Sequence, residues 1–141
     1  AKDVNMIKVL CKNGAEIDKI TYSKYVSGDT ELLEYLLSEC DMDPNFDKGL
    51  IVRDAVNTNN VEVLRLFIKY GGDITIRQNF PIRTASTKGN YEVIEELCKE
   101  YKRLRLSKNS EEFNDIKNWI MDGVDSEEDG EKVIKFIESK L

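Results

Sequence analysis

The sequence contains no histidine, only two prolines, one tryptophan and three cysteines. Histidine is the commonest general base and the commonest metal ligand in proteins, so its absence removes the usual centre of a catalytic or zinc site. No paired carboxylates, catalytic triad or Gly-rich phosphate loop can be assembled from the remaining residues. We therefore expect a protein that is not an enzyme and that uses no cofactor.

The three cysteines are too few and too scattered for a disulfide framework, and they lack the C-x-x-C spacing of a zinc site. We expect Cys11 and Cys98 to be small buried hydrophobic residues, which is typical of free cysteines. Cys40 falls near the end of an expected helix, where no resolving cysteine for a redox role is visible. Reduced thiols favour a cytoplasmic location.

Three aspartates, Asp41, Asp43 and Asp47, resemble half of a calcium-binding loop. The sixth and twelfth positions of that loop do not carry the glycine and the glutamate that the motif needs. We therefore expect no metal site.

No apolar run approaches the roughly 20 residues of a membrane-spanning helix, and no signal-peptide pattern opens the sequence. The formal net charge of −6 argues against a general affinity for nucleic acid. The length of 141 residues suits one domain. The first residue is an alanine inside a continuing pattern, so we expect a fragment or a processed chain.

One helical pattern recurs along the chain in segments that start at Asp3, Asp29, Asn60 and Asn90. Each starting residue can cap a helix with its side-chain oxygen. The third, fourth, seventh and eighth following positions are always apolar, which gives one wide stripe on a helix. These positions are Met6, Ile7, Leu10 and Cys11; Leu32, Leu33, Leu36 and Leu37; Val63, Leu64, Phe67 and Ile68; and Val93, Ile94, Leu97 and Cys98. Helices with the same stripe are expected to stack on each other.

A shorter helical segment precedes two of these helices. It begins at Leu50 and again at Phe80, and both copies have an aliphatic residue, Arg, one spacer and Ala. Pro81 suits the first turn of a helix, where its missing N–H costs nothing. Gly89, and also Asn59, can adopt the left-handed conformation that ends a helix. The repeating unit is therefore a short helix, a tight turn, a longer helix and an extended link.

These residues resemble the ankyrin repeat. The short-helix signature of the family, T-P-L-H-x-A, is matched by residues 80–85, and its G-A-D-x-N link is matched by residues 14–18, 41–45 and 71–75. The nearest variant is the roughly 30-residue repeat of giant DNA viruses, which similarly pairs Ile-Arg-x-Ala-Ser with Gly-x-x-Glu-Val. The resemblance covers residues 1 to about 104 and implies an all-α solenoid of stacked helix-turn-helix repeats.

The chain departs from the family pattern in several places. Arg53 and Arg83 replace the motif histidine, and the finger between link and short helix is about three residues shorter than in the 33-residue consensus. After Asp18 the spacing is shorter still, so residues 19–29 are expected to hold barely one helical turn in place of a short helix. After Cys98 the link is lost, and we expect the repeat array to stop there.

The end of the chain is expected to form two further helices, capped by Ser110 and Ser126. One side of the first carries Phe113, Ile116, Trp119 and Ile120. We expect Trp119 to anchor this pair on the stack. We divide the chain into ankyrin-like repeats, residues 1–108, and a C-terminal helical pair, residues 109–141, that caps the stack. The pair is either a degraded ankyrin repeat or an unrelated cap.

Two groups of basic residues allow more than one interpretation. Arg53 and Arg83 either grip an acidic partner or donate to backbone carbonyls of adjoining links, and we favour the second because a guanidinium offers five donors. A further basic cluster lies at a helix C-terminus, where cations are favoured in any protein. Its members are Lys99, Lys102, Arg103, Arg105 and Lys108. We expect no nucleic-acid binding there.

The resemblance implies a non-catalytic scaffold that binds a protein partner through its short finger loops and its concave face. The best candidates for contact are positions at which the two matched repeats differ in chemistry. They are Phe46, Asp47, Lys48, Arg77 and Gln78 in the fingers, and Asn57, Thr58, Thr87 and Lys88 at the ends of the short helices. The alternative function is an ankyrin accessory domain of a larger enzyme or adaptor protein.

The resemblance to viral ankyrin proteins also implies a partner and a location. We expect a host protein as the partner and the host-cell cytoplasm as the location. We expect neither a nucleic acid nor a membrane as partner, and we expect a monomer.

Overall fold

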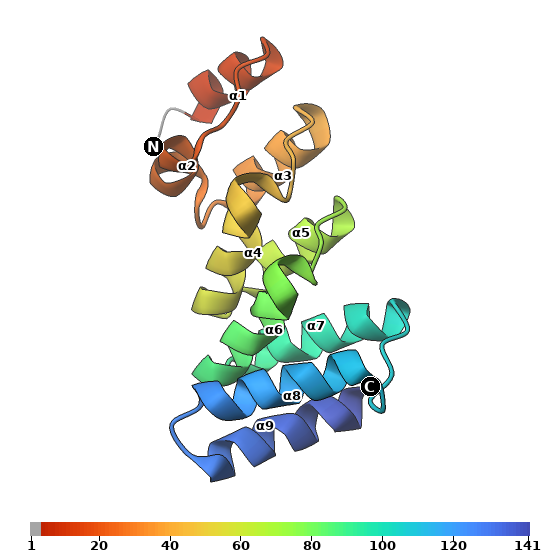
Figure 1. Ribbon diagram of the computed structural model, residues 1–141. Coiled ribbons are helices and arrows are strands. Elements are labelled where there is room, and N and C mark those ends of the chain that lie inside the picture. Colours follow the sequence, from red (N-terminus) through yellow and green to blue (C-terminus); the bar gives the residue numbers. More distant parts are fainter. Residues whose placement is uncertain (1–3) are drawn as a thin grey trace.

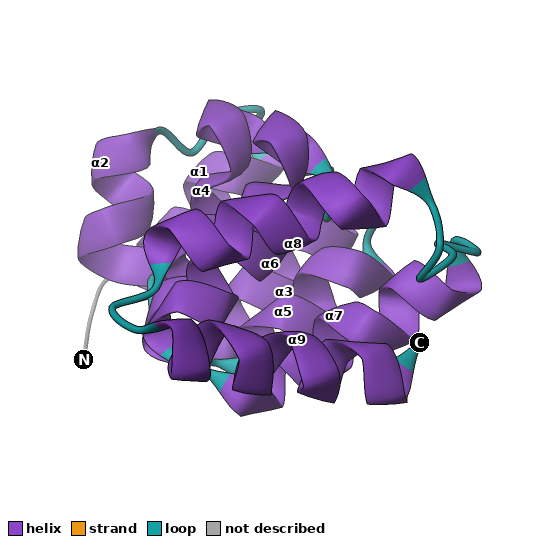
Figure 2. Cartoon of the chain, turned by 60° about the horizontal axis from the view of Figure 1, so that its bottom comes forward, coloured by secondary structure: helices purple, strands orange, loops and turns teal. Residues whose placement is uncertain are grey.

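The computed structural model describes residues 4–141 and shows only helices as regular elements in that range (Figures 1 and 2). The all-α fold class is thereby confirmed. The helices are α1 (Val4–Lys12), α2 (Lys19–Thr21), the π-helical turn η1 (Tyr22–Val26), α3 (Thr30–Glu39), α4 (Phe46–Thr58), α5 (Val61–Lys69), α6 (Ile76–Lys88), α7 (Tyr91–Arg103), α8 (Glu111–Gly123) and α9 (Glu127–Lys140). The expected cap at Asp3 lies outside the described residues.

The helices form an elongated stack of two rows (Figure 1). In one row α1 packs on α3, α3 on α5, α5 on α7 and α7 on α9. In the other row α4 packs on α6 and α6 on α8. The rows are joined by contacts of α4 with α5, α6 with α7 and α8 with α9, so α8 and α9 occupy the same relative positions as the helix pairs before them.

The apolar stripe of the long helices forms the core between these layers. Leu36, Phe67 and Leu97 are each 0% exposed. The expectation that the whole stripe is buried is wrong for Met6 and Leu10, which are 52% and 49% exposed. The reason is that α1 packs chiefly on α3, so the half of its stripe that turns away from α3 has no neighbour among the described residues.

The two short helices form the C-terminal parts of α4 and α6, and they begin later than the first residues of these elements. Residues 47–49 and 77–79 have left-handed φ and ψ angles, so the regular helices start at Leu50 and Phe80, as the sequence predicts. Asn59 and Gly89 end them in the expected left-handed conformation, at φ 55° and 66°. Each short helix is thus bounded by a left-handed turn at both ends.

The segment before α3 is more helical than predicted. Lys19–Thr21 and Tyr22–Val26 form consecutive α- and π-helical turns, where barely one turn was expected. Asp18 caps this segment by accepting from the Thr21 N–H at 2.7 Å. Tyr22 and Val26 are each 1% exposed, and their burial against the following repeat explains the extra turn.

Of the predicted helix caps within residues 4–141, all are confirmed except the one at Asn90. Asp29 and Asn60 accept from the N–H groups three residues on, and Ser110 and Ser126 do the same in the C-terminal pair. At α7 the Val93 N–H is capped instead by Asn59, from the corresponding turn of the preceding repeat, at 3.2 Å. Asn90 turns away and donates its side-chain amide to the Val56 carbonyl at 2.8 Å. Neighbouring repeats therefore exchange hydrogen bonds.

Two of the cysteines meet in the stack. Cys11 and Cys98 are buried as expected. Cys40 lies against Cys11, which sequence reasoning missed because the contact depends on α1 packing on α3. Burial, with a smaller contribution from Cys40, raises the pKa of Cys11 to about 12. A thiol with that pKa is almost fully protonated at neutral pH and is a poor nucleophile.

Truncation of the stripe should destabilise the whole stack. We expect Leu36→Ala and Phe67→Ala each to lower the free energy of unfolding by roughly 2–5 kcal/mol, because both side chains are fully buried and their removal leaves a cavity. Urea titration followed by circular dichroism measures the change, with the exposed Ser38→Ala as control. Equal stability of Leu36→Ala and Ser38→Ala would show that the stripe does not face the stack.

Asn59 should contribute more to stability than its exposure suggests. We expect Asn59→Ala to cost roughly 1–3 kcal/mol, because alanine loses the cap of α7 and also disfavours the left-handed backbone. Asn59→Gly loses only the cap and should cost less. Urea unfolding compares the two variants. A stability of Asn59→Gly equal to that of the unaltered chain would show that the Asn59–Val93 hydrogen bond contributes nothing.

Candidate interaction surface

Two successive fingers project from the stack in the same unusual conformation. Asp47, Lys48 and Gly49 have φ angles of 50°, 57° and 85°, and residues 77–79 have 52°, 58° and 60°. A left-handed backbone costs about 1 kcal/mol or more for each residue that is not glycine. This strain is retained because the surroundings of the fingers hold them in place.

The second finger is held by a buried polar network. Asn79 is 9% exposed and accepts a short hydrogen bond from the Tyr101 hydroxyl of α7. Its amide donates to the Glu112 carboxylate of α8 at 3.2 Å. Burial raises the pKa of Tyr101, with a smaller contribution from Glu112. The finger, α7 and α8 are therefore connected through one asparagine, whose short side chain tolerates the left-handed backbone.

Arg83 braces the second finger as predicted for a residue that replaces the motif histidine. Its Nε donates to the Gln78 carbonyl at 2.9 Å and its terminal nitrogen donates to the Arg77 carbonyl at 3.1 Å. Arg53, in the preceding repeat, behaves differently from this expectation. It makes a 3.7 Å ion pair with the Asp47 carboxylate, because the finger there carries an acidic side chain within reach.

Trp119 does not anchor the C-terminal pair in the core. It is 45% exposed, whereas Phe113, Ile116 and Ile120 on the same helix are buried. Its ring instead stacks against the Arg83 guanidinium, with the Arg83 Cζ atom 4.2 Å from the ring centroid. Trp119 therefore lies against Arg83 of α6 and not in the core.

A solvent-open hollow of about 440 Å³ lies between the second finger and the short helix of the preceding repeat. Its lining comes from both repeats and consists of Arg53, Arg77, Gln78, Phe80 and Arg83. Of these residues, only Arg77 and Gln78 are expected contact residues. Phe80 was missed because, in sequence, it reads only as the apolar start of a short helix.

Phe46 differs from the other expected finger residues. Asp47, Lys48, Arg77 and Gln78 are exposed, but Phe46 is half-buried. Its ring packs edge-on against Tyr22, with ring centroids 5.7 Å apart and an interplanar angle of 66°. Phe46 therefore connects the first finger to the helical segment before it.

The expected contact residues form two separate groups. Asn57, Thr58, Thr87 and Lys88 are exposed, but they lie at the C-terminal ends of the short helices, whereas the fingers lie at the N-terminal ends. A helix of nine residues separates such ends by about 13 Å. Asn57 and Thr58 donate to carbonyls of their own helix, at 2.8 Å each. The fingers therefore form the more coherent candidate surface.

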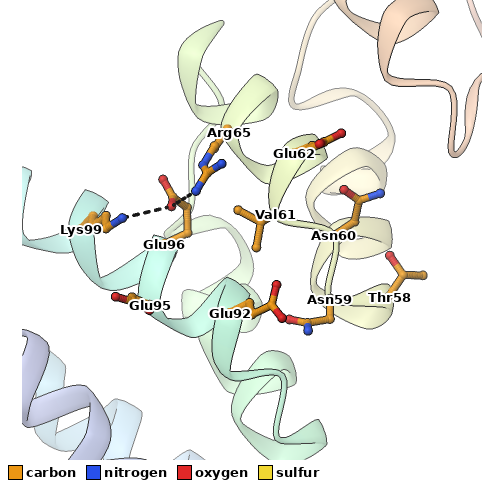
Figure 3. A pocket seen from close by; sticks show the side chains of 10 residues that line it. All are labelled: Thr58, Asn59, Asn60, Val61, Glu62, Arg65, Glu92, Glu95, Glu96 and Lys99. Carbon is orange, nitrogen blue, oxygen red and sulfur yellow. Dashed lines mark ion pairs between the residues drawn. The ribbon is translucent and has the colours of Figure 1, made fainter.

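A second, acidic groove lies on the other row of helices, between α5 and α7 (Figure 3). It has a volume of about 620 Å³. Its lining includes Glu62, Glu92, Glu95 and Glu96 together with Arg65 and Lys99. Arg65 and Lys99 both reach Glu96, at 3.3 and 3.6 Å. The cations in this groove are thus already partnered by carboxylates.

Ion pairs of this kind connect α3 to α5, α5 to α7 and α7 to α9. Glu34 of α3 pairs with Lys69 of α5 at 3.0 Å, Arg65 of α5 with Glu96 of α7, and Glu95 of α7 with Lys140 of α9 at 3.4 Å. A hydrogen bond from Lys69 holds the pKa of Glu34 below its usual value. Exposed pairs add little stability, but they neutralise acidic charge along this row.

Among residues 4–141, no cluster of three or more His, Cys, Asp or Glu side chains is arranged to hold a metal ion. In the same range, no helix is long and apolar enough to cross a bilayer.

The chain is similar to a viral protein. It is 33% identical over 101 residues to the "I-Kappa-B like protein C2" of Microplitis demolitor bracovirus (isolate Webb), an alignment that covers 68% of this chain and 53% of that protein. The chain thus spans about half the length of this relative. No protein-family model matches the chain, and no solved structure matches it.

Arg83 and Arg53 should differ in their contribution to stability. We expect Arg83→Ala to cost roughly 1–3 kcal/mol, because it removes two hydrogen bonds to the finger and the stacking on Trp119. Arg53→Ala removes only an exposed ion pair and should cost less than about 1 kcal/mol. Urea unfolding measures both. Trp119 is the single tryptophan, so its fluorescence emission should change in Arg83→Ala and not in Arg53→Ala; the reverse pattern would contradict the stacking.

Proposed function

We propose that this chain, which is a divergent ankyrin-repeat protein similar to a viral one, is a non-catalytic scaffold that binds a protein partner. The surface that carries the proposal is the pair of left-handed fingers. They present Asp47, Lys48, Arg77 and Gln78 to solvent on a backbone that the neighbouring helices hold in a strained conformation. A surface prepared in this way loses little conformational entropy on binding.

The C-terminal pair serves as the cap of the array in this proposal. It covers the apolar faces of α6 and α7 with Phe113, Ile116 and Ile137, which are 0–1% exposed. Repeat arrays need such a covering at their ends to stay soluble. The division into repeats, residues 1–108, and cap, residues 109–141, follows from this role.

The relative supports a partner that is a protein of the host. Its name describes an I-kappa-B-like protein of a bracovirus, and proteins of a virus that act in a cell meet host proteins there. We place the function of this chain in the host-cell cytoplasm and expect it to act as a monomer. Because the aligned segment is only 53% of the relative, an accessory domain of a larger enzyme or adaptor is the second candidate.

Site-specific photo-crosslinking in host-cell lysate tests the proposed surface. A photoreactive amino acid at Gln78 should crosslink a partner, whereas the same group at the exposed Lys135 of α9 should not. The variant Lys48→Ala/Arg77→Ala/Gln78→Ala should lose that partner by about tenfold or more, since arginine often dominates interface energy. Its folding should be nearly unchanged, because exposed substitutions usually stay within about 0.5 kcal/mol each.

A matched variant of the acidic groove controls for surface change in general. Glu62→Ala/Glu92→Ala/Lys99→Ala alters three exposed residues of α5 and α7 and should retain the partner. If this variant loses the partner and the finger variant keeps it, the acidic groove is the binding site and the proposal is wrong. Phe46→Ala is tested separately, because its packing on Tyr22 makes a loss of stability the expected result.

A further inference from the structure

The hollow beside the second finger carries more positive charge than its surroundings neutralise. Three of its five lining residues are arginines and none is acidic. Arg77 is exposed and makes no ion pair with any described residue. One carboxylate, that of Asp47, pairs with a lining arginine: it lies 3.7 Å from the Arg53 guanidinium, which is a loose ion pair. An arginine-lined hollow of this kind can accept carboxylates from a ligand.

The Arg83 side chain and the backbone that carries Arg77 are also held in position before any ligand arrives. Arg83 is fixed by two finger carbonyls and by the ring of Trp119, and it uses only part of its five donors. Arg77 is carried on a finger whose last residue, Asn79, is bound by Tyr101 and Glu112. Guanidinium groups that are oriented in advance lose less freedom for each hydrogen bond that they form.

The positive charge stands out because the chain as a whole is acidic. The formal net charge is −6, and the acidic side chains of the long-helix row lie around the groove between α5 and α7 (Figure 3). In that groove, Arg65 and Lys99 both form ion pairs with Glu96. A highly acidic partner is therefore repelled by the groove between α5 and α7 and attracted by the arginines beside the second finger, which gives the approach a preferred direction.

We propose that the hollow beside the second finger binds an extended protein segment rich in aspartate and glutamate, with Arg77 and Arg53 contacting its carboxylates and Phe80 packing against its aliphatic parts. This inference rests on the proposed function and specifies the chemistry of the partner. The hollow spans two repeats, so a segment in extended conformation can place successive acidic side chains on Arg53 and Arg77. Arginine–carboxylate contacts are often bidentate, which favours such a segment over a neutral one.

Fluorescence anisotropy with a labelled poly-glutamate peptide tests the inference. A peptide of about 15 residues is long enough to span two repeats at roughly 3.3 Å per residue. We expect binding that weakens as salt rises from about 50 to 300 mM, because the contacts are ionic and exposed. A neutral Gly-Ser peptide of the same length should not bind. Trp119 emission should change on binding of poly-glutamate, since its ring stacks on Arg83 beside the hollow.

A pair of charge reversals locates the binding. Arg77→Glu should weaken poly-glutamate binding by about tenfold or more, since it replaces an attraction by a repulsion at the contact. Lys135→Glu changes the net charge by the same amount on an exposed residue of α9 and should weaken binding by less than about twofold at physiological salt. Circular dichroism confirms that both variants are folded.

The outcomes separate this inference from the proposed function. Absence of poly-glutamate binding at low salt, or equal binding by Arg77→Glu and Lys135→Glu, overturns the inference. If a single-stranded oligonucleotide of equal charge binds more tightly than poly-glutamate, the ligand is not an acidic protein segment and the inference is wrong. A partner that crosslinks at Gln78 through a segment without acidic residues leaves the proposed function standing and removes the inference alone.

Discussion

The structure depends on one constraint: a helix pair of this chain can bury its apolar stripe only against the next pair. Leu36, Phe67 and Leu97 are fully buried because each lies between layers. Where a neighbour is absent from the described residues, as on the outer side of α1, the same positions of the pattern are exposed at Met6 and Leu10. Stability is therefore close to a sum over neighbouring layers and is not concentrated in one central core.

Layers held only by apolar contact could slide, and a set of asparagines prevents this. Asn59 caps the helix of the following repeat, Asn90 donates back to Val56, and Asn45 accepts from the Asp73 N–H of the next link at 2.8 Å. These bonds are directional, so each repeat has one register relative to the next. Because the fingers are attached to these links, the register also fixes how far apart Arg53 and Arg77 lie.

The features predicted correctly from sequence are those that depend on local periodicity. The stripe, the left-handed ends at Asn59 and Gly89, and the start of the short helices at Leu50 and Phe80 all follow from residue type and spacing. The errors concern contacts between segments. Asn90 was expected to cap its own helix, and a single sequence cannot show that Asn59 reaches α7 first. The contact of Cys40 with Cys11 was missed for the same reason.

For the candidate surface, too, local features were predictable from the sequence and contacts between segments were not. Exposure of Lys48, Arg77 and Gln78 was predictable, because residues that differ between repeats are free of packing. The hollow itself was not, because Phe80 and Trp119 each read in sequence as ordinary apolar residues of a helix. Trp119 lies on the finger side only because α8 continues the row of short helices and so brings its ring over Arg83.

The distribution of charge gives the shortened fingers a consequence for recognition. In the long-helix row, cations such as Lys69, Arg65 and Lys140 are each matched to a carboxylate of the neighbouring helix. In the fingers, Asp47 and Arg77 occupy corresponding positions of successive repeats and have opposite charge. Asp47 partly neutralises Arg53, whereas Arg77 adds to Arg83. A partner therefore meets two fingers of the same backbone shape and different charge, and this difference defines the direction in which an asymmetric acidic segment can bind.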